Sequence, residues 1–318
     1  MKNIVFLNLS KINFDEKLNF ASFKSLGSIT KYDASTDKEI LERVKGQNIV
    51  ITKELPLGKD LISKFPSSVE LICEAGTGYN NIDLEAAKEK GIAICNIPGY
   101  SSEAVAQLAI TFMLNLSSSL QLQQVMIKQK NFTNFTQHLS VPHFEMQNKI
   151  LGVIGAGSIG QQVIKVARAL GMKVLVYSRT PKEWNDSNIK FVSLEELLKN
   201  SDFVSLHCPL TPNTKYIIDK DRLTMMKPSA FIINTSRGAL INEKALIEAL
   251  HEGKIAGAAL DVQDPEPPEL TNPLFEMDNV ILTPHIGWKC IESRQRLIDL
   301  LADNIDAFIK GTPINRVG

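Results

Sequence analysis

A glycine-rich segment, LGVIGAGSIG at residues 151–160, constrains the fold of this chain more than any other feature. It follows the apolar run KILGVI and opens the amphipathic stretch SIGQQVIKVARALG, so it predicts a strand, a tight turn and a helix in succession. A GxGxxG pattern alone is weak evidence for this fold, because glycine-rich turns recur by chance. The flanking strand and helix make it specific, and together they predict a doubly wound α/β fold.

Each glycine of this turn has a separate predicted role. Gly155 permits the tight turn, Gly157 lets the backbone approach a pyrophosphate, and Gly160 allows close packing of the helix on the strand. The phosphate charge is expected to meet the unpaired N–H groups of Ser158 and Ile159 at the positive end of the helix. The motif therefore predicts a dinucleotide site, and a purely structural turn is the alternative.

Short apolar runs and amphipathic stretches alternate along most of the chain. The first series of strand candidates, within residues 2–98, is NIVFLN, SITKYD, NIVITK, LICEAG and IAICNI. The second series begins at Lys149 and comprises KILGVIGAG, KVLVYS, DFVSLHC, AFIINTS, IAGAALDV and NVILTP. Such alternation predicts parallel sheets covered on both faces by helices. The expected fold class is α/β, with a doubly wound Rossmann domain inserted in a flavodoxin-like domain.

The two series predict a discontinuous two-domain chain. Residues 1–99 and 288–318 are expected to form the substrate-binding domain, and residues 100–287 the dinucleotide-binding domain. The closing segment 292–311 is predicted to be one amphipathic helix that returns to the first domain, the alternative being that it packs only on the second. An apolar helix is expected at 101–120, buried in the core or between subunits. The polar stretch that follows is expected to be a surface excursion, and EWNDSNIK a solvated connector.

The composition argues against several function classes. The 318 residues include 35 Lys and Arg and 35 Asp and Glu, so the formal net charge is zero. This balance argues against a basic surface for nucleic acid or membrane lipid. The apolar core of the N-terminus, Ile4 to Leu7, is too short for a signal peptide, and no stretch approaches the roughly 18 apolar residues that cross a bilayer.

The four cysteines are scattered along the chain without a CxxC pair. Three of them lie in or beside apolar strand-like runs, so buried free thiols are favoured over disulfides or zinc ligands. We therefore expect a cytoplasmic protein with no metal site.

The end of the second strand after Lys149 indicates which cofactor is held. An NAD site usually has Asp or Glu there, about 20 residues beyond the glycines, bonded to the ribose hydroxyls. Here KVLVY is followed by Ser178, Arg179 and Thr180, with no carboxylate. A guanidinium and two hydroxyls suit a 2′-phosphate, so NADP(H) is favoured over NAD(H). The alternative is that Arg179 stacks on adenine and both cofactors bind.

Three residues far apart in sequence, Arg237, Glu266 and His285, each follow an apolar run. Arg237 comes just past a strand end, where ligands gather in open α/β sheets, and its planar guanidinium suits carboxylate and keto oxygens. His285 follows another strand and supplies a side chain type that exchanges protons near neutral pH. Glu266 can bond the second imidazole nitrogen and favour the protonated acid. Alone, each residue has a structural explanation; beside a dinucleotide motif, they predict hydride transfer between nicotinamide and a small 2-keto or 2-hydroxy acid.

The chain resembles the D-isomer-specific 2-hydroxyacid dehydrogenase family over essentially its whole length. The matching segments are VIGAGSIG, SLHCPLTPNT, MMKPSAFIINTSRGALIN, AGAALDV with a following PEPP, and LTPHIGW. The resemblance implies an NAD(P)-dependent dehydrogenase acting on a CH–OH donor. It also implies that Arg237 binds the substrate carboxylate, that His285 is the acid/base and that Glu266 is its partner.

The resemblance implies further cofactor contacts. Asp261 is expected near the nicotinamide amide, and Thr235 and Ser236 along the cofactor cleft. His285 and Gly287, in the segment LTPHIGW, are expected beside the cofactor as well.

For the substrate, the resemblance implies a role for the loop AGTGYNNID. Its backbone N–H groups indicate Thr77 and Gly78 as carboxylate contacts, which closure of the domains is expected to bring towards Arg237. In this family the apolar helix near residues 101–120 commonly belongs to a homodimer interface.

Within the family, NIPGYSSEAVAQ, EAGTGYNN and the Trp288 after PHIG look most like the glycerate dehydrogenase (hydroxypyruvate reductase) branch. Two departures bear on the substrate: Gln263 replaces the Phe usual after LDV, and Glu74 puts a charge beside the substrate loop. The alternatives are a glyoxylate or D-lactate type reductase on the same scaffold, and a non-catalytic dinucleotide-sensing interaction protein. His207 is expected either to touch the nicotinamide ribose or to be structural.

Overall fold

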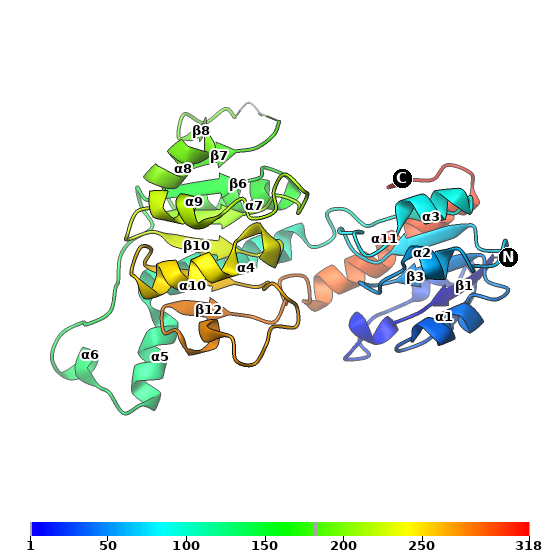
Figure 1. Ribbon diagram of the computed structural model, residues 1–318, viewed down its shortest axis with the longest axis horizontal. Coiled ribbons are helices and arrows are strands. Elements are labelled where there is room, and N and C mark those ends of the chain that lie inside the picture. The colour runs from blue at the N-terminus through cyan, green and yellow to red at the C-terminus, as the bar shows by residue number, and fades with distance from the viewer. Residues whose placement is uncertain (1, 181–183, 318) are drawn as a thin grey trace. The chain divides into compact units, whose positions relative to one another are not determined.

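The chain forms two compact units (Figure 1). The computed structural model describes residues 2–180 and 184–317. Unit 1 combines the residues up to Ser101 with those from Trp288 onward, and unit 2 is Ser102–Gly287. Unit 2 is therefore inserted between the two parts of unit 1. The boundary lies after Ser101, where the sequence analysis places it after residue 99, and unit 2 begins with the first residue of α4 (Ser102–Ser118).

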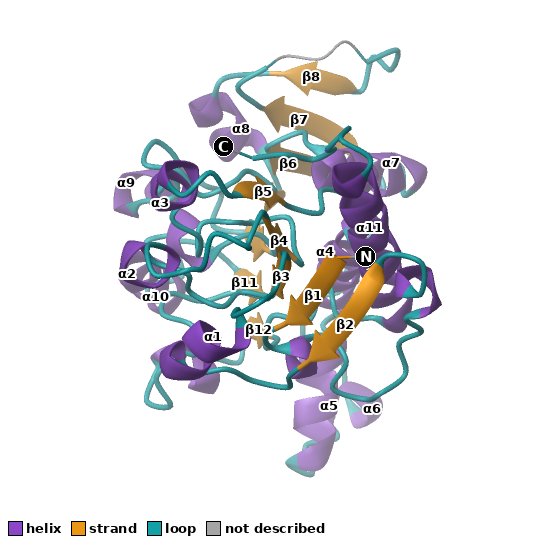
Figure 2. Ribbon diagram, turned by 90° about the vertical axis from the view of Figure 1, so that its right-hand side faces the viewer, coloured by secondary structure: helices purple, strands orange, loops and turns teal. Residues whose placement is uncertain are grey.

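Unit 1 contains a five-stranded sheet in the order β2-β1-β3-β4-β5, in which all paired strands are parallel. This is the strand order of flavodoxin-like folds. Figure 2 shows β1 and β2 side by side at one edge. The strands are β1 (Lys2–Phe6), β2 (Gly27–Lys31), β3 (Ile49–Thr52), β4 (Leu71–Glu74) and β5 (Ala93–Cys95).

Helices cover both faces of this sheet, and each face has its own apolar core. The helices are α1 (Asp37–Arg43), α2 (Lys59–Ile62), α3 (Leu84–Glu89) and α11 (Ile291–Ile309), with 3-10 turns η1 (Leu9–Lys11) and η2 (Ala21–Phe23). The long helix α11 buries Leu297, Ile298 and Leu301 in the same core as strand residues of β1 and β3. The C-terminal helix thus packs on the N-terminal sheet.

Unit 2 contains a seven-stranded parallel sheet in the order β12-β11-β10-β9-β6-β7-β8. The chain runs outward from β6 to β8, then returns to the other side of β6, so the strand order reverses between β6 and β9. Ligands in open α/β sheets bind at such a switch point. The strands are β6 (Ile150–Ile154), β7 (Lys173–Tyr177), β8 (Ile189–Phe191), β9 (Phe203–Leu206), β10 (Phe231–Asn234), β11 (Gly257–Leu260) and β12 (Val280–Leu282).

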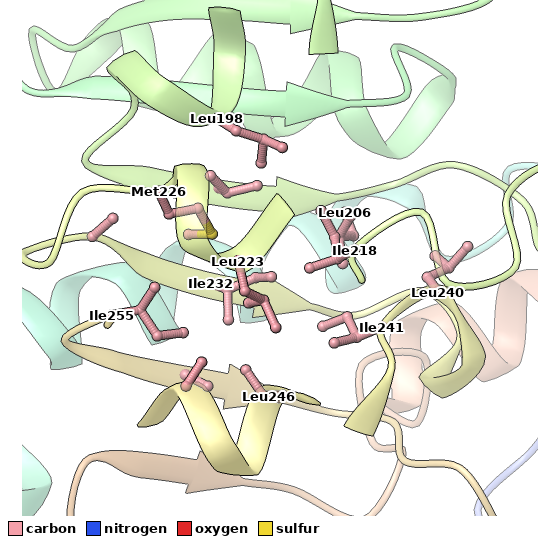
Figure 3. Close-up of a cluster of buried hydrophobic side chains, with 14 of the residues drawn as sticks. Leu198, Leu206, Ile218, Leu223, Met226, Ile232, Leu240, Ile241, Leu246 and Ile255 are labelled. Carbon is pink, nitrogen blue, oxygen red and sulfur yellow. The ribbon is translucent and has the colours of Figure 1, made fainter. Parts of the chain in front are cut away.

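The central strands β9, β10 and β11 are buried on both faces, which explains their continuous apolar sequences. The helices are α4, α5 (Leu120–Lys128), α6 (Thr133–Thr136), α7 (Ser158–Ala169), α8 (Leu194–Asn200), α9 (Lys220–Met225) and α10 (Glu243–His251), with turns η3 (Gly238–Leu240) and η4 (Pro273–Glu276). Figure 3 shows one core of this unit, in which Leu198 of α8, Leu223 of α9 and Leu246 of α10 pack with strand residues. Burying each such leucine contributes roughly 2 kcal/mol.

Two short helices, α5 and α6, extend away from the sheet of unit 2 (Figure 1). Neither buries any residue. Within the described residues, no single helix is long and apolar enough to span a membrane. The bent pair α4 and α5 meets that length and composition test only when its two helices are counted together.

The predicted fold class is confirmed, with two local differences. Strand β8 (Ile189–Phe191) was not predicted, because its first two residues end the segment EWNDSNIK, which was expected to be a solvated connector and whose Glu183 lies outside the described residues. A three-residue edge strand is too short to show an alternating pattern. No sequence pattern distinguished α5 from the predicted apolar helix before it. The four cysteines are free thiols, and all but Cys290 are buried.

Candidate functional site

The glycine turn between β6 and α7 has the geometry that its sequence predicts. Gly155 has a φ of +99°, and a Cβ there would lie 2.6 Å from the backbone nitrogen of Cys208. A Cβ on Gly160 would lie 2.1 Å from the carbonyl oxygen of Gly155. Both positions therefore require glycine. A Cβ on Gly157 would meet nothing within 4 Å, so the space beside this residue is open to a ligand.

Helix α7 begins without a side-chain cap. Gly157 is its N-cap, no side chain accepts from the first turn, and that turn carries no acidic residue. Ser158 is exposed and Ile159 is half-buried, so the first N–H groups of the helix lie near solvent. Uncapped N–H groups at the positive end of a helix form a ready anion site. These residues fit the pyrophosphate of a dinucleotide.

The segment after β7 lies beside this turn. Gly155 N–H donates to the carbonyl of Tyr177, the last residue of β7, at 2.8 Å. Ser178 is half-buried, and Arg179 and Thr180 are exposed. These three residues therefore follow a strand end that is hydrogen-bonded directly to the glycine turn.

Arg237, Glu266 and His285 all belong to unit 2, and the structure brings them together. Glu266 Oε2 lies 3.0 Å from His285 Nδ1, and Glu266 Oε1 accepts from the N–H of Gln263 at 3.0 Å. Arg237 directly precedes η3 in an extended conformation, and its Nη1 donates to the carbonyl of Ser236 at 2.7 Å. The guanidinium is also close enough to act on the pKa of Glu266.

The surroundings of Glu266 keep it ionised. Burial, the largest influence, raises its pKa, but the hydrogen bond with His285 and the charge of that ring lower it. The Gln263 N–H and Arg237 act in the same direction, and the net result is a pKa below the ordinary value of 4.5. A carboxylate that stays ionised can orient the imidazole and stabilise its protonated form. Because this bond occupies Nδ1, Nε2 is the nitrogen left for a substrate.

Asp261 fixes the backbone around His285. This carboxylate is 1% exposed, and it accepts from Thr283 Oγ1 at 2.5 Å and from the N–H groups of Ile286 and Gly287, each at 2.8 Å. His285 has a φ of +50°, and its N–H donates to the carbonyl of Asp261 at 2.9 Å. A non-glycine residue in this region is strained and must be held by its surroundings.

This anchoring role of Asp261 was missed at the sequence level, where the residue was expected to meet the nicotinamide amide. Both of its oxygens already accept hydrogen bonds from the loop that carries His285. No motif in the sequence indicates which side chain supports a turn twenty or more residues further on, so only the folded structure reveals it.

Three polar residues border the switch point. The Oγ1 of Thr235 is buried and has no partner among the described residues, so a bound group can satisfy it. Ser236 Oγ donates to the carbonyl of Cys208 at 2.7 Å, which joins the ends of β9 and β10. His207 Nε2 lies 2.8 Å from Ser205 Oγ, and burial lowers the pKa of this ring to about 4. A neutral, internally bonded His207 favours its structural role.

The predicted substrate loop lies in unit 1, after β4. Two of its carbonyl groups are held by hydrogen bonds. The N–H of Ile97 donates to the carbonyl of Gly76 at 2.8 Å, and Asn96 Nδ2 donates to the carbonyl of Thr77 at 2.7 Å. Thr77 Oγ1 donates to the carbonyl of Ile97 at 3.0 Å. Within the described part of the chain, the N–H groups of Gly76, Thr77 and Gly78 donate no hydrogen bond. The loop therefore presents fixed, unused donors.

Known proteins resemble this chain along nearly its whole length. The model of the D-isomer specific 2-hydroxyacid dehydrogenase NAD binding domain matches residues 110–287. A hydroxypyruvate reductase of Blautia hydrogenotrophica is 39% identical over 307 residues, covering 94% of this chain and 95% of that protein. A glycerate dehydrogenase of Methylorubrum extorquens is 35% identical over 321 residues, covering 99% of both. The crystal structure of a glyoxylate reductase from Paecilomyes thermophila matches with a TM-score of 0.87 and 31% identity, covering 99% of this chain and 98% of that one.

Proposed function

The chain belongs to the D-isomer-specific 2-hydroxyacid dehydrogenase family, and from that premise we propose that it is a glycerate dehydrogenase, or hydroxypyruvate reductase. The family makes it a nicotinamide-dependent oxidoreductase; the choice of hydroxypyruvate is the proposal. The observation that carries the dehydrogenase chemistry is the hydrogen bond between Glu266 and His285, in the same unit as the uncapped glycine turn. The names of the two curated relatives support this substrate.

The proposed mechanism assigns one task to each residue. Arg237 binds the carboxylate and keto oxygens through its planar fork. His285, oriented by Glu266 through Nδ1, gives a proton from Nε2 to the keto oxygen. Asp261 holds the backbone of His285 so that the imidazole keeps this position. The reduced nicotinamide supplies the hydride.

In unit 1, we assign the substrate carboxylate to the N–H groups of Thr77 and Gly78. Their donors are unused among the described residues, and the carbonyls around them are held by Asn96 and Ile97. Preorganised N–H groups bind an anion without first giving up other hydrogen bonds.

For the cofactor, the proposal is a preference for NADP(H) over NAD(H). Ser178, Arg179 and Thr180 follow the strand whose end is bonded to Gly155, and none of them is acidic. Replacing Arg179 with Ala is expected to raise the KM for NADPH about tenfold and to change the KM for NADH little, because one charge-assisted phosphate contact is lost. Steady-state kinetics with both cofactors tests this. A higher catalytic efficiency with NADH in the wild-type enzyme contradicts the preference.

The excursion of unit 2 supports a homodimer. Leu120, Phe132, Phe135 and Leu139 are 49–71% exposed, and α5 buries no residue. Exposed apolar side chains gathered on one protrusion mark an interaction surface. We propose that a second copy of the chain covers them, which light scattering on the eluted protein can test. The four free thiols agree with a reducing compartment, and we propose the cytoplasm.

A panel of keto acids, each measured with NADH and NADPH, tests the proposed function. The expected result is the highest kcat/KM with hydroxypyruvate. The likeness to a glyoxylate reductase favours glyoxylate as the second candidate, and a higher kcat/KM for glyoxylate would establish it. D-lactate type activity would appear as a preference for pyruvate. Tight dinucleotide binding with no turnover on any keto acid would favour a non-catalytic sensor instead.

A further inference from the structure

Two charged side chains are buried beneath the substrate loop of unit 1. Lys53 directly follows β3, and Glu74 is the last residue of the neighbouring strand β4. Lys53 is 3% exposed and Glu74 is fully buried. Burying charge in a strand end is costly unless partners compensate it, so the position of this pair requires a reason.

Both charges lie against Gly76 of the loop. A Cβ on Gly76 would be 3.1 Å from Lys53 Nζ and 3.3 Å from Glu74 Oε1. Gly76 thus lets the ammonium and the carboxylate approach the backbone that presents the unused N–H groups. Charges this close to the loop backbone would interact electrostatically with a carboxylate bound to its N–H groups.

Specific partners hold each charge in place. Lys53 Nζ lies 2.6 Å from Glu54 Oε1 and 4.2 Å from the centre of the Trp288 ring, a cation–π contact. Glu74 accepts from the N–H of Glu54 and from Asn81 Nδ2, each at 2.9 Å. These contacts define one orientation for both side chains.

We propose that Lys53 and Glu74 set the charge beneath the loop Gly76–Gly78 and thereby tune its affinity for the substrate carboxylate. Lys53 attracts the carboxylate, and an ionised Glu74 cancels much of that attraction. The two are positioning residues that act through the loop. The inference rests on the proposed function, because it takes Thr77 and Gly78 as the carboxylate contacts.

The balance between these charges changes near neutral pH. Burial raises the pKa of Glu74 to about 7, against the opposing effects of Asn81, the Glu54 N–H and the charge of Lys53. For Lys53, burial lowers the pKa, but Tyr100, Glu54 and Glu74 outweigh it, so the ammonium stays charged. The titratable groups facing the pair are thus Glu54, Tyr100 and the buried thiol of Cys73, whose pKa burial raises further above its ordinary value. Carboxylate affinity should fall as the pH rises through neutrality and Glu74 ionises.

The direct test measures the Kd of oxamate, a carboxylate inhibitor shaped like a small keto acid, on the enzyme saturated with reduced cofactor. Titration calorimetry from pH 6 to pH 8.5 is expected to show roughly a tenfold weakening for wild-type protein, from a like charge a few ångströms away. The variant Glu74→Gln should weaken clearly less over this range, because the contribution of the Glu266–His285 pair is common to both proteins and only that of Glu74 is removed. Glu42→Gln, the same change on the exposed face of α1, should keep the wild-type profile.

Lys53 variants test the other half of the pair. Lys53→Met should weaken oxamate roughly tenfold at pH 6, whereas Lys53→Arg, which keeps the charge, should recover most of the affinity. The double variant Lys53→Met with Glu74→Gln should bind weakly, with the same pH dependence as Glu74→Gln alone. Fluorescence titration of reduced cofactor should give the same Kd in all variants.

Two results would overturn the inference: a Glu74→Gln profile that parallels the wild type, or a Lys53→Met variant with wild-type affinity. If Lys53→Met does not fold, the Glu74→Gln and Lys53→Arg profiles decide. Failure of the proposed function is distinct, because it appears as a wild-type protein that reduces no keto acid.

Discussion

Two glutamates, one in each unit, have pKa values shifted in opposite directions. Burial raises the pKa of Glu74, beneath the loop of unit 1, to about 7. For Glu266 in unit 2, burial also raises the pKa, but His285, the Gln263 N–H and Arg237 together outweigh it, and the pKa falls below the ordinary value. A glutamate therefore titrates near neutral pH in unit 1, whereas in unit 2 it is a fixed negative charge.

The contrast indicates how the two units divide the work. Unit 2 places partly exposed charges after strand ends, where they can touch a substrate and move a proton. Unit 1 presents backbone N–H groups in its loop, and its charged side chains, Lys53 and Glu74, are buried beneath that loop. Substitutions in unit 2 should therefore reduce turnover, whereas those beneath the loop in unit 1 should change binding and its pH dependence.

Replacing His285 with Ala is the most severe test of this division. We expect kcat to fall about 10³-fold or more, because the keto oxygen then lacks a positioned proton donor. Cofactor affinity, measured by fluorescence titration, should stay nearly unchanged. Wild-type turnover in this variant would show that the chemistry lies elsewhere.

Replacing Arg237 with Ala should reduce kcat/KM about 10²-fold to 10³-fold, through loss of the fork that binds the carboxylate and keto oxygens. Arg237→Lys should recover little of this, since an ammonium cannot hold two oxygens in the same plane. Steady-state kinetics on the keto acid compares the two variants. Full recovery by Lys would mean that only the charge at this position matters.

Much of unit 2 could be predicted from sequence, because its function depends on patterns that sequence displays. The glycine turn requires small residues at fixed spacing, and parallel buried strands give long apolar runs. The contact between Glu266 and His285, nineteen positions apart, could be predicted because both residues lie in segments that follow neighbouring strands of one sheet. The support that Asp261 gives to the His285 loop carried no such signal.

In unit 1, the sequence predicted all five strands but not the environment of their ends. Glu74 was recognised only as an unusual charge beside the loop, and Lys53 was not singled out. Their burial depends on the pairing of β3 with β4 and on Trp288, which returns from the far end of the chain. Contacts between residues so distant in sequence leave no local pattern, which is why the pair could not be predicted.

The variant Glu266→Gln tests whether the fixed charge of unit 2 matters. We expect kcat/KM at neutral pH to fall about tenfold to a hundredfold, because the amide orients the ring without stabilising its protonated form. The lowered pKa of Glu266 means that its pairing is present above pH 4.5 and is lost as pH falls through the lower folded value. In the wild type, kcat/KM should therefore fall at low pH as Glu266 is protonated, and in the variant this fall should be absent. If the wild type and the variant lose kcat/KM in the same way at low pH, the charge of Glu266 has no part in the reaction.

The smallest expected effect concerns stability, and it returns to Glu74. A carboxyl whose pKa is about 7 folded and 4.5 unfolded contributes stability below pH 4.5 that is lost as pH rises through 7. The loss is at most about 3 kcal/mol, since each pKa unit is worth about 1.4 kcal/mol. Glu74→Gln removes this titration. Its amide also makes a poorer hydrogen bond with Asn81, which lowers stability by the same amount at every pH. The Tm of Glu74→Gln, relative to that of the wild type, should therefore be higher at pH 9 than at pH 5. Glu42→Gln is the matched control. An unchanged gap in Tm at the two pH values would mean that Glu74 keeps its charge throughout, and the contrast with Glu266 would disappear.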